Sequence, residues 1–291
     1  MSTLSRNIRL LITGGGGQLA QAIKEEEATF ENVTSIHLSK SELDITSTSS
    51  IKKTLDLHQP DVIINTAAYT AVDAAEEDKE KAFLVNEIGV KNLAQACKDN
   101  GIKLIHISTD YVFDGEKPEE YTEEDIPNPT TVYGKSKLAG EQAIITSGLL
   151  DYAIIRTSWV YSVYRSNFVK TMLRLGNEKD EISVVNDQYG SPTLANNLAS
   201  VILQLSNVLT THNAGVYHYT NEGVTTWYAF AKAVFSYKKM SINVLPVSSD
   251  RFVTKATRPK NSKLESSKII NLLGIENVPW EESLEKMLVK L

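Results

Sequence analysis

The sequence predicts an α/β fold in which a doubly wound parallel sheet is followed by a smaller C-terminal domain. Short apolar runs rich in β-branched residues alternate with helix-like segments through the first half of the chain. A glycine-rich loop joins the first run to the first helix-like segment. After residue 157 the alternation loosens, and aromatic residues, Asn and Gly become frequent. We therefore expect a sheet domain at residues 1–157 and a second domain at 158–291, with some segments of the second returning to the sheet.

The composition of the 291-residue chain limits the function classes. A hydrophobic content of 42% is ordinary for a soluble globular protein. The formal charge of −6 argues against a nucleic-acid-binding surface. The single Cys97 excludes an intrachain disulfide and suits a reducing cytoplasm. The N-terminal apolar run, residues 10–12, is too short for a signal peptide or a membrane span. We expect a cytoplasmic protein that binds neither nucleic acid nor membranes.

The first strand, expected at residues 8–12, leads into a loop of four glycines that opens a helix over residues 18–24. Gly14, Gly17 and Ala20 fit the spacing G-x-x-G-x-x-G/A. Glycines in such a turn let the backbone approach a pyrophosphate, which the helix N-terminus attracts. A glycine-rich turn alone could be merely flexible, but its place between strand and helix favours a Rossmann-type dinucleotide site.

The second strand, at residues 33–38, ends in Ser39 and Lys40. A site that prefers NAD usually has an acidic residue there, on the ribose 2′-OH. A hydroxyl and a cation suit a 2′-phosphate instead, so we expect NADPH as cofactor, with NADH also accepted. A solvated lysine at a strand end is an equally good interpretation. Asp44 and Ile45 are weaker candidates for contacts with the adenine.

The third strand, at residues 61–65, leaves the sheet through small residues that include Ala67, Ala68 and Thr70. Small side chains at the carboxyl end of a strand leave room for a ligand. Apolar spacing then predicts one helix over residues 81–100.

The fourth strand, at residues 103–108, ends at Ser108, and Thr109 and Asp110 follow directly. Two hydroxyls and a carboxylate at a strand end could bind a ligand or simply cap the next element. A fifth strand at residues 152–156 follows.

Residues 132–141, V-Y-G-K-S-K-L-A-G-E, contain a Gly-Lys-Ser that could be taken for the end of a phosphate-binding loop. That motif needs a glycine five positions before the Gly-Lys pair, where this chain has Pro129. Proline has no N–H to offer a phosphate, so we reject this interpretation. Tyr133 and Lys137 are spaced i, i+4, and in a helix they share one face.

Chemistry gives a reason for the Tyr133–Lys137 spacing. A free phenol has a pKa of roughly 10, and a lysine ammonium one helical turn away is expected to lower that value. The tyrosine can then donate its proton to a carbonyl oxygen as hydride reaches the carbon, while a neighbouring hydroxyl holds the oxygen. The pattern Y-x-x-x-K alone is common, and its position after the Ser-Thr strand end gives it weight.

Taken in order, these motifs resemble those of the extended short-chain dehydrogenase/reductase superfamily, and within it the dTDP-4-dehydrorhamnose reductases. The resemblance covers nearly the whole chain. It rests on G-x-x-G-Q-L, N-T-A-A-Y-T-A-V-D-x-A-E, S-T-D-Y-V-F-D-G, V-Y-G-K-S-K-L-A-G-E, R-T-S-W-V-Y, N-D-Q-Y-G-S-P-T and R-P-x-N-S.

The resemblance implies an enzyme that uses NADPH to reduce the C4 ketone of dTDP-4-dehydro-β-L-rhamnose, giving dTDP-β-L-rhamnose. It makes Tyr133 the catalytic acid, Lys137 the ligand of the nicotinamide ribose, and Thr109 a contact of the sugar, with Ser108 as a less direct helper. The cofactor contacts expected from the motifs and the resemblance together are Gly14, Gly17, Gln18, Leu19, Ser39, Lys40, Asp44, Ile45, Ala67, Ala68, Thr70, Tyr133 and Lys137. The expected substrate contacts are Thr109, Asp110, Trp159, Val72 and Arg258, the last because an arginine fork suits a diphosphate.

Other interpretations stay open at this point. Relatives of this fold serve as regulatory subunits, and others are nucleotide-sugar epimerases or dehydratases that retain NAD. The histidines show no metal-ligand spacing. Some relatives pair two subunits through Mg²⁺ held by glutamates, but the corresponding positions here are Ala22 and Asn196. We therefore expect no metal, and any homodimer should form without a bridging ion.

Overall fold

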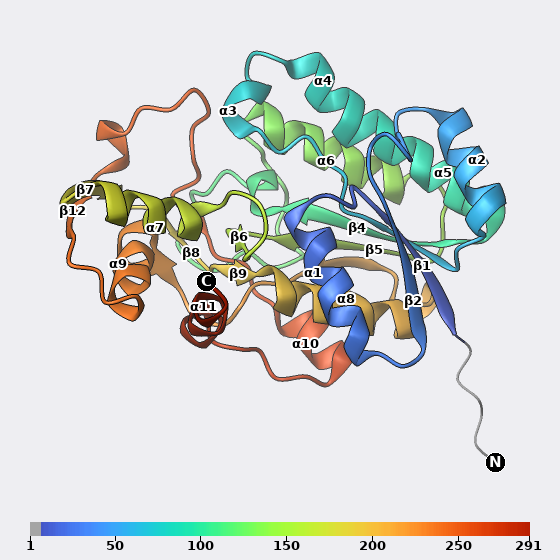
Figure 1. Ribbon diagram of the computed structural model, residues 1–291. Helices are drawn as coiled ribbons and strands as arrows, with labels where there is room; N and C mark the ends of the chain where they lie inside the picture. Colours follow the sequence, from blue (N-terminus) through green and yellow to red (C-terminus); the bar gives the residue numbers. More distant parts are fainter. Residues whose placement is uncertain (1–6) are drawn as a thin grey trace.

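A six-stranded parallel sheet forms the centre of the computed structural model, which describes residues 7–291 (Figure 1). The strand order is β10-β5-β4-β3-β1-β2. The strands are β1 (Ile8–Thr13), β2 (Val33–Leu38), β3 (Val62–Asn65), β4 (Lys103–Thr109), β5 (Tyr152–Thr157) and β10 (Gly215–His218). Every neighbouring pair in this sheet is parallel, which confirms the predicted fold class.

Helices cover both faces of the sheet (Figure 1). In β1 the side chains of Leu10 and Ile12 enter one core and that of Leu11 enters the other, as expected where successive side chains alternate between faces. The first face carries α1 (Gln18–Glu26), α8 (Ala195–Val208) and α10 (Ser267–Leu273). The second carries α2 (Thr48–His58), α5 (Val90–Asn100) and α6 (Val132–Ile145).

The order of the strands creates a crevice at the carboxyl end of the sheet. Both β2 and β3 lie beside β1, so the sheet grows outward in opposite directions from β1. The loops that follow β1 and β3 therefore separate at this point, and open α/β sheets bind ligands at such a switch point.

The second half of the chain supplies a smaller layer beside the sheet (Figure 1). This layer has its own core around Phe230. Its helices are α7 (Phe168–Glu178), α9 (Trp227–Tyr237) and α11 (Trp280–Val289). Its strands are β6 (Val160–Tyr161), β7 (Glu181–Val185), β8 (Tyr189–Gly190), β9 (Thr193–Leu194), β11 (Thr225–Thr226), β12 (Asn243–Val247) and β13 (Asn261–Ser262). Since β10, α8 and α10 pack with the sheet although they follow residue 157, the two halves interleave. The division at residue 157 stays a prediction.

The helix predicted over residues 81–100 is interrupted. It consists of α4 (Lys79–Phe83), a π-helical turn η2 (Leu84–Gly89) and α5. Within the π turn, the buried Asn86 amide accepts from the N–H of Tyr69 and donates to its carbonyl oxygen. The π turn thus provides hydrogen-bond partners for the backbone N–H and C=O of Tyr69, in the loop next to the crevice. Hydropathy spacing does not predict this π turn.

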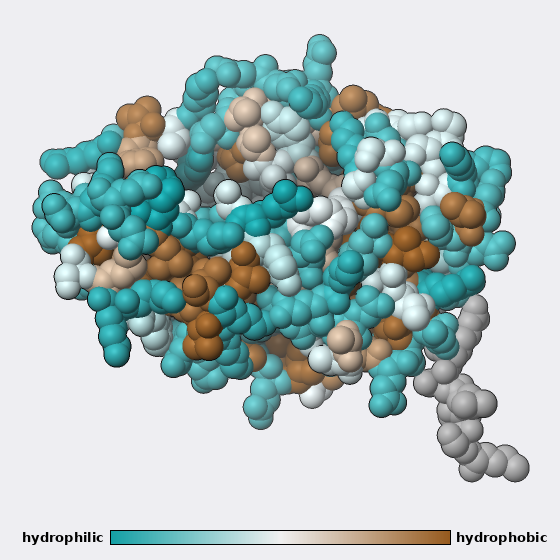
Figure 2. All heavy atoms as spheres, viewed as in Figure 1, coloured by the Kyte–Doolittle hydropathy of each residue, from teal (hydrophilic) through white to brown (hydrophobic). Residues whose placement is uncertain are grey.

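The remaining short elements are α3 (Val72–Ala75), η1 (Glu27–Thr29), η3 (Asp110–Val112), η4 (Thr211–Asn213) and η5 (Ser249–Arg251). Among residues 7–291, no helix has the length and apolar character needed to cross a membrane. The face shown in Figure 2 is largely hydrophilic, and a recess opens in it below α3 and beside α7.

Candidate active site

Helix α6 brings Tyr133 and Lys137 to the sheet edge because its start is fixed in three ways. The Thr131 hydroxyl caps the helix by accepting from the N–H of Gly134 at 3.0 Å. Gly134 lies so close to η3 that a Cβ there would be 2.1 Å from the Tyr111 carbonyl oxygen. The backbone N–H of Val132 donates to Glu76 at 2.9 Å. The glycine of V-Y-G-K-S-K is therefore a packing residue, as the rejection of the phosphate-loop interpretation requires.

Tyr133 is buried, and burial raises the pKa of its phenol to about 12, while a hydrogen bond with Thr109 acts in the opposite direction. The prediction that the lysine would lower this pKa is wrong for the structure. The Lys137 nitrogen donates to the Ile107 carbonyl at 2.7 Å and lies 3.1 Å from Nε2 of His106. Desolvation is therefore the largest effect on the phenol, and it raises the pKa of Tyr133.

Lys137 is itself only 2% exposed. Burial lowers the pKa of its ammonium group to about 8, and the negative charge of Glu141, one turn further along α6, opposes this shift. A lysine that exchanges its proton near neutral pH suits proton transfer better than an ordinary surface lysine does.

Ser108 is committed elsewhere. Its hydroxyl donates to Glu141 at 2.5 Å, and Glu141 forms a buried ion pair with Arg156 at 2.7 Å. Arg156 is thus a structural arginine. Because the Ser108 hydroxyl donates its only proton to Glu141, it has none to donate to a substrate. Thr109 is then the hydroxyl that interacts with Tyr133. The Thr109 hydroxyl donates to Asp110 at 3.0 Å.

A cavity of about 730 Å³ follows the crevice at the switch point. A Cβ on Gly14 would lie 2.9 Å from Cα of Ala67, so the close approach of the two loops requires glycine, at a φ of +66°. The predicted residues that line this cavity are Gly14, Gly17, Gln18, Leu19, Lys40, Asp44, Ile45, Ala67, Ala68, Thr70, Val72, Ser108, Thr109, Asp110, Tyr133, Lys137 and Trp159. The glycine cradle, the strand-end lysine and the volume of the cavity fit a nicotinamide dinucleotide.

Ser39 is not among the residues that line this cavity. Its N–H and its hydroxyl both donate to the Glu42 carboxylate, at 2.8 and 2.7 Å. The strand end therefore carries an acidic side chain three residues after the serine, which the sequence argument overlooked. Lys40 remains the residue there that suits a 2′-phosphate.

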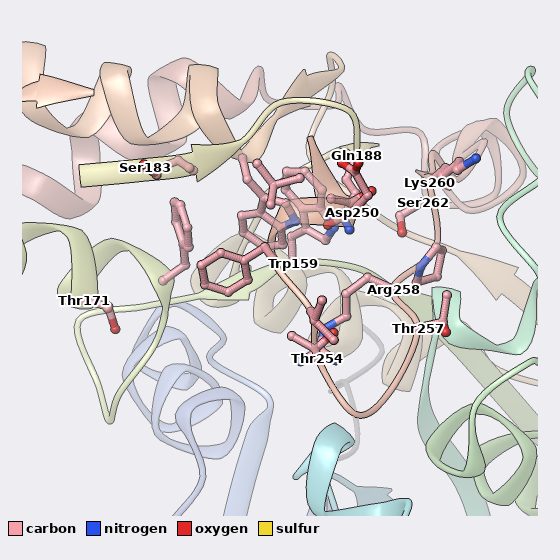
Figure 3. Close-up of a pocket in the computed structure, with 18 of the residues that line it drawn as sticks. Trp159, Thr171, Ser183, Gln188, Asp250, Thr254, Thr257, Arg258, Lys260 and Ser262 are labelled. Carbon is pink, nitrogen blue, oxygen red and sulfur yellow. The ribbon is translucent and has the colours of Figure 1, made fainter. Parts of the chain in front are cut away.

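Figure 3 shows a second cavity, of about 1140 Å³, which shares lining residues with the first. Asp110, Tyr111 and Trp159 line both cavities. Trp159 lies near the middle of the close-up, with Thr171 and Ser183 to one side and Arg258 to the other.

Trp159 is held in an unusual conformation. Its backbone φ is +50°, a left-handed value that is uncommon outside glycine. Its ring stacks on Trp227 with centroids 3.6 Å apart, and a Cβ on Gly190 would lie 2.6 Å from the ring. One face of the indole is thus covered by another tryptophan. The surrounding packing maintains the backbone strain, as is common at ligand sites.

Arg258 lines the second cavity, but its guanidinium is already paired. It donates to both Asp73 carboxylate oxygens, at 2.8 and 2.5 Å. Arg258 holds the pKa of Asp73 down at about 2. The predicted contact with a diphosphate stays a prediction, and the structure adds a second role, since this pair joins the 254–258 segment to α3.

Several lining residues were not predicted. In the first cavity they include Leu43, Thr46, Thr66, Tyr69, Lys81, Val85, Ile107, Thr157, Ser158 and Val160. Tyr111, in S-T-D-Y-V-F, was within reach of the motif argument. Its ring lies edge-on to Tyr133 with centroids 5.5 Å apart. The segments 168–185 and 249–262 of the second cavity carry no local signal that links them.

The two positions considered for a bridging metal lie at the contact between α1 and α8. Ala22 is buried there, and the Asn196 amide donates to Glu25 and Glu26 at 2.9 and 2.8 Å. Within the described part of the chain, no three His, Cys, Asp or Glu side chains cluster as metal ligands would.

A doubly wound sheet, a glycine cradle at its switch point and a Tyr-x-x-x-Lys pair facing the same cavity define a nicotinamide-dependent oxidoreductase of the extended short-chain dehydrogenase/reductase class. The family described as "RmlD substrate binding domain" matches residues 8–291. The chain belongs to that family.

Similar proteins agree over nearly the full length. The chain is 41% identical over 288 residues to a dTDP-4-dehydrorhamnose reductase of Sinorhizobium fredii, covering 96% of each. It is 39% identical over 282 residues to the spore coat polysaccharide biosynthesis protein SpsK of Bacillus subtilis, covering 96% of each. The structure of dTDP-4-dehydrorhamnose reductase from Bacillus anthracis in complex with NADP has a TM-score of 0.90 and 43% identity, and the match covers 98% of this chain and 100% of that one.

Proposed function

We infer that the protein reduces the C4 ketone of dTDP-4-dehydro-β-L-rhamnose to the alcohol of dTDP-β-L-rhamnose, with NADPH as the reductant. The observation that carries this proposal is the position of Tyr133, Thr109 and Lys137 along a cavity that fits the dinucleotide, next to a second cavity that shares Asp110 with it. Relatives named as dTDP-4-dehydrorhamnose reductases match 96% and 98% of the chain.

The residues of the first cavity fit the cofactor in a defined order. The glycine loop and the N-terminus of α1 receive the pyrophosphate, because free N–H groups and the helix dipole attract negative charge. Lys40 lies where a 2′-phosphate is expected. NADPH, when bound, supplies the hydride. Lys137 holds the ribose next to it.

The chain's own residues handle the proton. As the ketone oxygen gains negative charge, the Tyr133 phenol donates its proton to that oxygen. The Thr109 hydroxyl, which donates to Asp110 when no substrate is bound, turns its proton to the same oxygen. Tyr133 then recovers a proton from Lys137, and Lys137 recovers one from solvent. Each turnover thus consumes one hydride and one proton, as the reduction of a ketone to an alcohol requires.

The second cavity receives the nucleotide sugar. The part of the Trp159 ring that stays exposed packs against the C–H surface of the hexose, since aromatic rings suit apolar sugar surfaces. Asp110 accepts from sugar hydroxyl groups. Asp110, Tyr111 and Trp159 line both cavities, which supports a sugar end directed toward the first cavity. The diphosphate and base then extend along the loop that carries Arg258.

The test is a coupled assay of the purified protein with NADPH and the keto sugar. Oxidation of NADPH with formation of dTDP-β-L-rhamnose supports the proposal. An unchanged NADPH signal, together with tight cofactor binding, would favour a regulatory subunit. Protein that arrives with NAD bound and consumes no added NADPH would favour an epimerase. Formation of the 6-deoxy-talose epimer would keep the catalytic roles but reverse the face of hydride attack.

Because Cys97 is a buried free thiol, we place the enzyme in a reducing compartment, the cytoplasm.

A further inference from the structure

A row of three buried polar side chains crosses the sheet directly behind Lys137. Thr13, Asn65 and His106 occupy one register position on β1, β3 and β4. Each follows an apolar residue of the α6-facing core by two positions, so all three face the same side as α6. Polar side chains at three adjacent core positions are costly unless they are hydrogen-bonded.

The three side chains form one chain of hydrogen bonds that ends at the lysine. The Thr13 hydroxyl donates to the Asn65 carbonyl oxygen at 2.6 Å. The Asn65 amide nitrogen lies 2.9 Å from Nδ1 of His106, and Nε2 of that ring lies 3.1 Å from Nζ of Lys137.

Donor and acceptor roles along this chain follow from its first member. Thr13 Oγ1 already accepts from the N–H of Ala67 at 3.2 Å, so its own proton goes to the Asn65 oxygen. The Asn65 NH₂ group then faces His106 and donates to Nδ1. Burial and the charge of Lys137 lower the pKa of His106 and keep the ring neutral, so its single proton lies on Nε2. That N–H points at the lysine nitrogen.

We propose that His106 is a positioning residue for Lys137, whose Nε2–H, oriented by Asn65 and Thr13, opposes the lysine's ammonium form and so eases release of the lysine's proton. An ammonium group needs acceptors, and the Ile107 carbonyl supplies one at 2.7 Å. The ring supplies a donor in the next position, which favours the neutral amine. The proposal rests on the proposed function, in which Lys137 returns a proton to Tyr133.

The other charged and titratable groups near Lys137 act differently. Glu141, from the same helix, favours the ammonium form, although Arg156 shares its charge. Tyr133 is a neutral phenol until it reacts. Asp110, the first residue of η3, influences the pKa of Tyr133 and not that of the lysine. His106 is therefore the neutral group on β4 that can shift the equilibrium between the ammonium and amine forms of Lys137.

The enzymatic test replaces His106 with Gln, whose amide reaches the same position and can turn its oxygen toward the lysine. We expect the alkaline limb of the pH profile of kcat/KM to move up by about one pH unit, because an acceptor stabilises the ammonium form. At neutral pH we expect kcat to fall several-fold while KM for the sugar stays unchanged. The same swap at His218, a buried histidine that faces Arg156, is the control and should leave the limb in place.

The second measurement does not depend on turnover. Proton-coupled ¹⁵N spectra of the histidine rings in the folded protein should show His106 protonated at Nε2 and bare at Nδ1. In Thr13→Val, which loses the donor that orients Asn65, this preference should weaken or invert. An Nδ1-protonated ring in the wild type, or an alkaline limb that His106→Gln leaves unmoved or shifts downward, would overturn the proposal. If the wild-type protein shows the expected His106 tautomer but has no reductase activity, that result would count against the proposed function alone.

Discussion

At the scale of single residues, Tyr133 is where the proposed chemistry concentrates. We predict that Tyr133→Phe lowers kcat by about 10²- to 10⁴-fold, the usual contribution of a positioned acid. NADPH affinity should stay within a few-fold, because the ring keeps its edge-on contact with Tyr111. Steady-state kinetics and fluorescence titration with NADPH measure the two effects. Lys137→Ala is the comparison and should lower both kcat and NADPH affinity, since we assign Lys137 to cofactor binding and to proton transfer. Full activity in Tyr133→Phe would contradict the assignment of Tyr133 as the acid.

Lys40 and Glu42 should set the cofactor preference between them. We predict that Lys40→Ala raises KM for NADPH several-fold and leaves KM for NADH unchanged, because only NADPH carries the 2′-phosphate. Glu42→Gln should shift the preference further toward NADPH by removing a negative charge near the same group. Both effects should shrink in high salt, since exposed charges are screened. Equal effects of Lys40→Ala on the two cofactors would show that the lysine does not read the phosphate.

At the scale of elements, α6 is positioned by glycines that touch backbone. A Cβ on Gly140 would lie 2.1 Å from the carbonyl oxygen of Asn86 in the π turn. We predict that Gly140→Ala destabilises the fold by about 1–3 kcal/mol, the usual range for overpacking. It should also lower activity, because the helix that carries Lys137 must shift. Thermal unfolding and kcat measure both effects, and Lys135→Ala, an exposed site on the same helix, should change neither.

The ion pair between Arg258 and Asp73 fastens the 254–258 segment to α3. Because the folded pKa of Asp73 is lowered to about 2, its contribution is present above the unfolded pKa of about 4 and is lost as pH falls through about 2. We predict that Asp73→Asn raises the KM for the nucleotide sugar and speeds proteolysis between residues 248 and 258 at neutral pH. Lys255→Ala, at the neighbouring exposed pair with Glu77, is the matched control. Unchanged proteolysis in Asp73→Asn would show that other contacts hold the segment.

How much could be predicted depends on how local each signal is. The end of β4 was predictable to within one residue, and so was the tight turn at Gly14, because strand runs and glycine spacing are local signals. The π turn was not, since Asn86 is a polar position whose partner, Tyr69, becomes visible only in three dimensions. The orientation of Lys137 toward His106 was equally hidden, because the sequence shows helix spacing but not which buried atoms compete for the same nitrogen.

At the scale of the whole molecule, the α1–α8 contact bears on assembly. We propose that any homodimer forms without a bridging ion, since Asn196 presents an amide to Glu25 and Glu26. We predict that light scattering gives the same mass with and without EDTA. Asn196→Glu would place a third carboxylate beside these two, and is the variant in which added Mg²⁺ should change the mass. Dissociation of the unmodified protein on chelation would contradict the proposal.

The interleaving of the two halves has a consequence for biosynthesis. Strand β10 joins the sheet beside β5, and α8 packs on α1, which lies some 170 positions earlier in the chain. A ribosome that has released residues 1–157 has therefore exposed an unfinished sheet with one bare edge and an uncovered apolar face on α1. Such intermediates are prone to association, and long-range parallel pairing is slow. The nascent chain should therefore need protection until residue 218 has emerged, and a gene fragment cut at residue 157 should yield aggregate and not a free dinucleotide-binding module.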